Sequence, residues 1–89
     1  GLAVRLANPQ ALAMIKKGVS RIMAVDETAI LGAIQALAKH THNEVEGAGA
    51  ASLAAAFLER DAHVEDDQIG IVASGGNLEA KVLARALAL

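Results

Sequence analysis

The side chains best suited to chemistry stand in the short stretch Ser74-Gly75-Gly76-Asn77, between an apolar run and an amphipathic run. Ser74 supplies a hydroxyl that can donate and accept a hydrogen bond, and Gly75 and Gly76 let the backbone approach a ligand closely. Asn77 is a residue type that caps helices, and the unpaired N–H groups of a helix start favour polar or anionic groups. The pattern predicts a binding site where a strand gives way to a helix, although turn geometry alone explains the same residue types.

A second stretch with little side-chain bulk, Glu46-Gly47-Ala48-Gly49-Ala50-Ala51-Ser52, opens a segment whose pattern is helical to about residue 60. Such a helix start can approach a sheet, another helix or a ligand closely. Each of the two glycines costs roughly 1 kcal/mol relative to alanine inside a helix. Packing or function must therefore compensate for them.

Apolar runs and helical patterns alternate along the chain. Strands are predicted at residues 2–6, 21–25 and 69–73, and the last shows no polar alternation, as in parallel strands covered on both faces. Helices are predicted at residues 9–18, 26 to about 39, 47 to about 60, and 78–89. This alternation predicts an α/β fold, in which helices and a small parallel sheet form three layers.

Each predicted helix carries an apolar stripe at three- and four-residue spacing, which predicts one inward face per helix. Asn8, followed by Pro9, is expected to cap the first helix, and Asp26 is expected to cap the second. The expected inward residues are Leu12 and Ile15 in the first helix, Ile30, Ala33, Ile34 and Leu37 in the second, Ala50, Leu53, Ala54 and Phe57 in the third, and Leu78, Val82, Leu83, Ala86 and Leu87 in the fourth.

The composition is that of a protein interior, although 89 residues make at most one small domain or a piece of a larger one. Hydrophobic residues make up 54% of the chain, yet Phe57 is the single aromatic residue. A self-sufficient small domain usually relies on aromatic anchors. We therefore expect much of the surface to meet further chain or a second copy, and the start at Gly1 without Met fits a fragment.

The net charge of -2 and the scattered basic residues give no reason to expect a nucleic-acid partner. The absence of cysteine excludes disulfides and zinc–thiolate sites and fits a cytoplasmic protein. No uncharged stretch is long enough to span a membrane, and no signal peptide is indicated.

Two polar clusters have residue types that bind metals, but neither has the spacing of a metal site. His40, His42 and Glu44 lie in a polar break, where two-residue spacing places them on one side of a strand but not of a helix. Residues 65–67 are acidic but lack the spacing of a calcium loop. A solvated helix end and a solvated loop are the predicted roles, and no metal site is expected.

Two further patterns fall short of known catalytic or nucleotide-binding motifs. Ser52 and Ser74 stand in no nucleophile elbow, and no His–Asp pair has a visible placement beside either. Gly47-Ala48-Gly49 lacks the third glycine and the preceding strand of a dinucleotide-binding motif.

The order and spacing of Glu46-Gly47-Ala48-Gly49-Ala50-Ala51 and Ile71-Val72-Ala73-Ser74-Gly75-Gly76-Asn77 resemble the C-terminal part of the catalytic region of threonine dehydratases. Serine dehydratases and serine racemases are close by in the same group of pyridoxal-phosphate enzymes, whose fold resembles the tryptophan synthase β subunit. The resemblance covers nearly all 89 residues. It implies that residues 1–89 are a single domain or fragment of a pyridoxal-phosphate-binding catalytic domain.

The resemblance also implies roles for individual residues. Ser74 would hydrogen-bond the pyridine nitrogen of the cofactor, Gly75 and Gly76 would keep the space beside the ring open, and Asn77 would also belong to the cofactor-binding residues. Glu46 and Gly47 would lie near the cofactor's edge. A neutral hydroxyl does not hold that nitrogen protonated as a carboxylate does, which suits the elimination of water from a hydroxy amino acid. The expected reaction converts L-threonine or L-serine to a 2-oxo acid and ammonia.

The chain departs from the family in lacking its lysine motif and its glycine-rich phosphate loop. Lys16, Lys17, Lys39 and Lys81 all fall on helical surfaces, so no catalytic residue is predicted here. The amino-acid substrate, the remaining part of the same polypeptide and a second copy are the expected partners, and the chain alone is expected to be inactive. The alternative is a non-catalytic α/β module that oligomerises through its alanine-rich faces.

Overall fold

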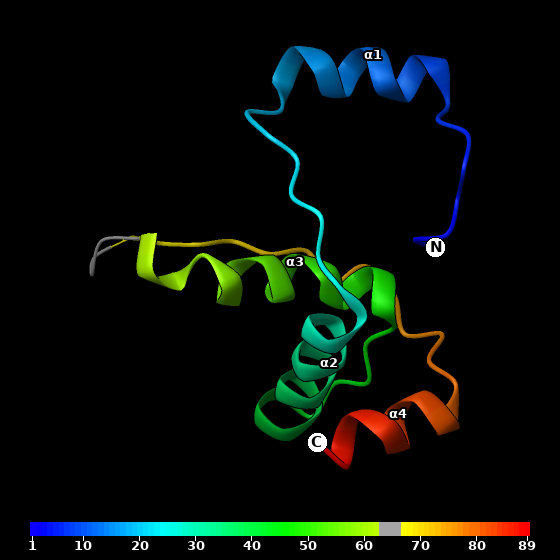
Figure 1. The fold of residues 1–89 in the computed structure, drawn as a ribbon, viewed down its shortest axis with the longest axis vertical. Helices are drawn as coiled ribbons and strands as arrows, with labels where there is room; N and C mark the ends of the chain where they lie inside the picture. Colours follow the sequence, from blue (N-terminus) through cyan, green and yellow to red (C-terminus); the bar gives the residue numbers. More distant parts are fainter. Residues whose placement is uncertain (63–66) are drawn as a thin grey trace.

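The computed structural model describes residues 1–62 and 67–89, and the regular secondary structure of that part is helical (Figure 1). The elements are α1 (Pro9–Gly18), α2 (Glu27–Thr41), α3 (Gly47–Leu58), the short 3-10 helix η1 (Arg60–Ala62) and α4 (Ala80–Leu87). The four predicted helices are confirmed, although α4 is shorter than predicted at both ends. None of the described helices is long and apolar enough to cross a membrane.

Side-chain caps explain where the first two helices begin. The Asn8 side-chain oxygen accepts from the backbone N–H groups of Gln10 at 3.0 Å and Ala11 at 3.1 Å, and Pro9 fills the first helical position. The Asp26 carboxylate accepts from the N–H of Ala29 at 2.8 Å. Both predicted caps are confirmed.

The core lies between α2, α3 and α4, and α2 packs against both of the other helices. Its buried residues are Ala33, Ile34, Leu37, Val45, Ala50, Ala54 and Ala86. Four of these seven residues are alanines, and Ile34 is the one large side chain among them that is fully buried. Leu53, Leu78, Val82 and Leu83 pack partly against this core, as their spacing predicted.

The predicted α/β fold with a parallel sheet is wrong, because the described residues form no strand. Residues 21–25 and 69–73 are extended but form no backbone ladder with each other, and residues 2–6 are also unpaired. Parallel strands are stable when helices cover both faces of the sheet. Here Ile22 is 80% exposed and Val72 is 74% exposed, so no second layer covers these apolar runs.

The predicted inward face of α1 is also wrong. The helix projects away from the other helices (Figure 1), and no residue of it is buried. Leu12 and Ile15 are exposed, since α1 contacts none of the other described helices. Its amphipathic pattern therefore has no partner in the described part of the chain.

An ion pair fixes the linker that follows α1. The Arg21 guanidinium donates two hydrogen bonds to the Glu59 carboxylate at the end of α3. Hydrogen bonding to Glu59 and its negative charge raise the pKa of Arg21.

Candidate functional site

The loop Ser74-Gly75-Gly76 lies against the first turn of α3. The N–H of Glu46 donates to the Gly75 carbonyl at 2.9 Å. A methyl group built on Gly49 would lie 3.1 Å from the backbone nitrogens of both Ser74 and Gly75. The structure thus brings together the two stretches that the sequence predicted for one site.

The Glu46 side chain approaches Gly75 closely. A Cβ atom at position 75 would lie 2.8 Å from the Glu46 carboxyl carbon and would clash with Oε1 of the same carboxylate. Gly76 is packed in a similar way, because its Cβ would lie 3.1 Å from the Glu44 carbonyl oxygen. The glycines therefore let the loop sit directly on residues 44–46.

The six predicted site residues line two cavities, three residues in each. Ser74, Gly75 and Gly76 line a cavity of about 390 Å³ together with Leu37, Asn43, Glu44, Val45 and Ala73. Glu46, Gly47 and Asn77 line a cavity of about 290 Å³ together with Gly1, Leu2, Ala3 and Ala48. The contact between Glu46 and Gly75 joins the two groups. Ser74 is exposed, so its hydroxyl is open to a ligand.

Asn77 does not cap α4, contrary to the sequence prediction. The helix begins at Ala80, and its N-cap is Glu79, which makes no side-chain capping bond. The N–H of Leu78 donates instead to the Gly76 carbonyl at 2.8 Å. The helix therefore begins two residues later than predicted, and Asn77 lines the second cavity.

Sequence reasoning missed the contribution of the N-terminal segment. Gly1, Leu2 and Ala3 face Glu46 and Gly47 across the second cavity. A Cβ on Gly1 would lie 3.0 Å from the Ala48 methyl group. The small residues at positions 1, 3 and 48 were the available signal, but spacing alone could not pair segments more than forty residues apart.

His40 and His42 lie at the C-terminal end of α2. His42 is the C-cap and adopts a left-handed conformation, with φ 58°. The Thr41 hydroxyl donates to the Leu37 carbonyl at 2.6 Å, and the Asn43 amide donates to Thr41. Across the described residues, no three His, Asp or Glu side chains come close enough to hold a metal. Glu65 and Asp66 of the acidic cluster lie outside the described residues.

The Ser52 hydroxyl has a structural bond. It donates to the Val72 carbonyl at 3.1 Å and holds the apolar stretch before Ser74 against α3. In Figure 1 this stretch runs beside α3. Ser52 therefore helps to place the loop that carries Ser74.

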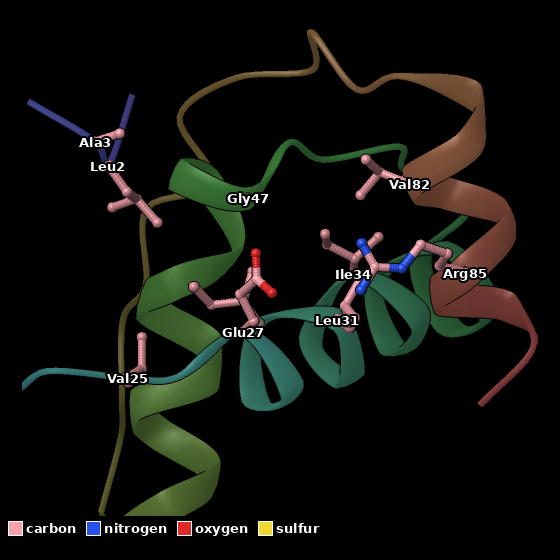
Figure 2. A pocket seen from close by; sticks show the side chains of 10 residues that line it. Leu2, Ala3, Val25, Glu27, Leu31, Ile34, Gly47, Val82 and Arg85 are labelled. Atoms are coloured by element: carbon pink, nitrogen blue, oxygen red, sulfur yellow. The ribbon is translucent and has the colours of Figure 1, made fainter.

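Figure 2 shows a third cavity, of about 390 Å³, between α2, α4 and the start of α3. Its floor is apolar, with Leu31, Ile34 and Val82 among the lining residues. Glu27 and Arg85 extend into it from α2 and α4. Gly47 is the one predicted site residue that lines this cavity.

Comparison with curated proteins supports the resemblance seen in the sequence. The chain is 34% identical over 85 residues to an L-threonine ammonia-lyase from Thermotoga maritima. The aligned region covers 96% of this chain but 21% of that relative, so the chain spans about a fifth of its length. No family model matches the chain, and no solved structure matches it. The chain is thus similar to one region of a threonine dehydratase-like enzyme.

Proposed function

We propose that this chain is part of a pyridoxal-phosphate-dependent ammonia-lyase that converts L-threonine or L-serine to a 2-oxo acid and ammonia. One observation carries the proposal: the exposed Ser74 stands in a loop seated on the start of α3 at Glu46. Its similarity to an L-threonine ammonia-lyase over 85 residues supports the same assignment.

The residues present fit one edge of such a cofactor. The cavity beside Ser74, at about 390 Å³, falls within the common size range of small-molecule sites, about 300–1,000 Å³. Gly75 and Gly76 add no side-chain bulk beside the hydroxyl. Pyridoxal phosphate supplies an electron sink for breaking bonds at the amino-acid α-carbon.

In this proposal, the Ser74 hydroxyl would hold the cofactor by donating a hydrogen bond to the pyridine nitrogen. Because a hydroxyl is neutral and weakly acidic, it leaves that nitrogen unprotonated, whereas a carboxylate would favour the protonated form. The Glu46 carboxylate lies beside Gly75, and the Glu46 backbone N–H bonds the Gly75 carbonyl and ties the loop to the start of α3. Asn77 and Gly47 bound the neighbouring cavity.

The lysine of such an enzyme would come from outside these 89 residues. Lys16, Lys17, Lys39 and Lys81 are all exposed, and none lines the two cavities at the site. Lys81 instead forms an ion pair with Glu79 at 3.1 Å. We therefore propose that turnover requires further chain from the same polypeptide.

The test uses the full natural polypeptide that contains these residues, supplied with pyridoxal phosphate. We expect it to release a 2-oxo acid from L-threonine or L-serine, and Ser74→Ala to lower kcat. The control is Ser20→Ala, an exposed serine that lines neither cavity at the site and is expected to leave kcat unchanged. Absence of 2-oxo acid from both substrates, or equal kcat in Ser74→Ala and wild type, would overturn the proposal.

A further inference from the structure

Gly49 is buried beneath the loop that carries Ser74. A methyl group at this position would lie 2.7 Å from Val45 Cγ1 and 3.1 Å from the backbone nitrogens of Ser74 and Gly75. Val45 is itself buried, so its side chain has little room to turn away. The two backbone nitrogens could move only if the loop moved with them.

Other contacts hold the same loop on either side of Ser74. The Gly75 carbonyl accepts from the N–H of Glu46 at 2.9 Å, and the Val72 carbonyl accepts from the Ser52 hydroxyl at 3.1 Å. Ser74 lies between these two bonds. A small displacement of the loop at Gly49 would therefore move the Ser74 hydroxyl, which lies between these two bonds.

Neighbouring glycines do not have this role. A methyl group on Gly47 would make an ordinary contact with Ile30 at 3.6 Å, and one on Gly32 would meet nothing within 4 Å. The close contact with the loop thus explains why glycine stands at position 49, although helix propensity disfavours it. Alanine there would push the loop away from α3.

We propose that Gly49 is a positioning residue that sets where the Ser74 hydroxyl stands relative to the cofactor ring. The inference rests on the proposed function. Gly49 lies against the loop backbone at Ser74 and Gly75, and in this proposal its effect on the cofactor passes through the Ser74 hydroxyl. Its substitution should therefore have no further effect once the Ser74 hydroxyl is removed.

A double-mutant cycle of Gly49→Ala and Ser74→Ala tests this, in the full natural polypeptide that contains the chain. The readout is the dissociation constant for pyridoxal phosphate, measured by fluorescence. Each single variant should weaken binding about three- to tenfold, the usual effect of losing one hydrogen bond. The double variant should bind no more weakly than Ser74→Ala alone. Gly32→Ala, at a helical glycine where a methyl group would meet nothing within 4 Å, is the matched control and should change the constant less than about twofold.

The cycle is repeated in a Val45→Ala background, which removes the side-chain clash and keeps Gly49→Ala folded. Multiplying effects in the double variant would overturn the role of Gly49, as would wild-type affinity in Gly49→Ala. Unchanged amide resonances of Ser74 and Gly75 in unliganded Gly49→Ala would also overturn it while leaving the proposed function intact. If Ser74→Ala binds the cofactor like wild type, the proposed function itself fails.

Discussion

Two glycines at the site differ in what a side chain would meet. At Gly75 the neighbour is the far end of a flexible side chain, the Glu46 carboxylate. At Gly49 it includes backbone atoms of the loop. Neither glycine has a positive φ, so alanine is allowed by backbone conformation at both positions. The cost of each substitution therefore depends on which neighbour can move.

Gly75→Ala should be nearly neutral for stability, because the Glu46 carboxylate can rotate away from the new methyl group. We expect the free energy of unfolding to fall by less than about 1 kcal/mol, against about 1–3 kcal/mol for Gly49→Ala. Urea denaturation of the two variants provides the comparison. Equal losses, or a larger loss for Gly75→Ala, would show that the Glu46 side chain is held rigidly.

At the scale of elements, α1 and α2 begin with similar caps but have different surroundings. The Asn8 side chain makes two capping bonds, and that of Asp26 makes one. α2 supplies three of the seven buried core residues, whereas α1 contacts no other described helix. The same kind of substitution should therefore have different global effects.

Asp26→Ala should lower the free energy of unfolding by about 1 kcal/mol, since the cap belongs to a packed helix. Asn8→Ala should leave global unfolding unchanged and reduce the helicity of α1 alone. Thermal unfolding reports the first effect, and amide hydrogen exchange within residues 9–18 reports the second. A fall in melting temperature for Asn8→Ala equal to that for Asp26→Ala would mean that α1 is packed in solution.

Local signals predicted the helices well, because caps and apolar spacing act within one element. Asn8, Asp26 and the stripe Ala33, Ile34 and Leu37 were all readable from the sequence. The predicted sheet was wrong, because pairing between strands depends on neighbours that sequence spacing does not reveal. Asn77 misled in a similar way, since the Gly76–Leu78 turn moves the helix start to Ala80.

The site, like the fold, was predicted in part. Residue types at Ser74–Gly76 and Glu46–Gly47 predicted two stretches that the structure places together. The walls formed by Gly1–Ala3 and by Asn43–Glu44 arise from tertiary packing. Whether these residues bind pyridoxal phosphate stays a prediction.

At the scale of the whole molecule, the described part of the chain is thin, measuring 39 by 36 by 19 Å. Its exposed large apolar side chains outnumber the buried ones, and they include Val4, Leu6, Met14, Ile22 and Val72. Extensive exposed apolar surface usually marks an interface. We propose that further chain of the same enzyme, or a second copy, covers it.

The 89-residue chain by itself should therefore self-associate and bind a hydrophobic dye. Its small net charge, -2, provides little repulsion against association. Sedimentation velocity across a concentration series measures the first property, and dye fluorescence measures the second. A monomer at every concentration, with no dye binding, would contradict an uncovered apolar surface.

The most direct test of the central claim is the nitrogen NMR resonance of ¹⁵N-labelled pyridoxal phosphate bound to the full natural polypeptide. With Ser74 as its partner, the ring nitrogen should be unprotonated, and Ser74→Asp should move the resonance to the protonated position. A protonated nitrogen in the wild type, or the same resonance in both proteins, would contradict the placement of the Ser74 hydroxyl against the cofactor ring.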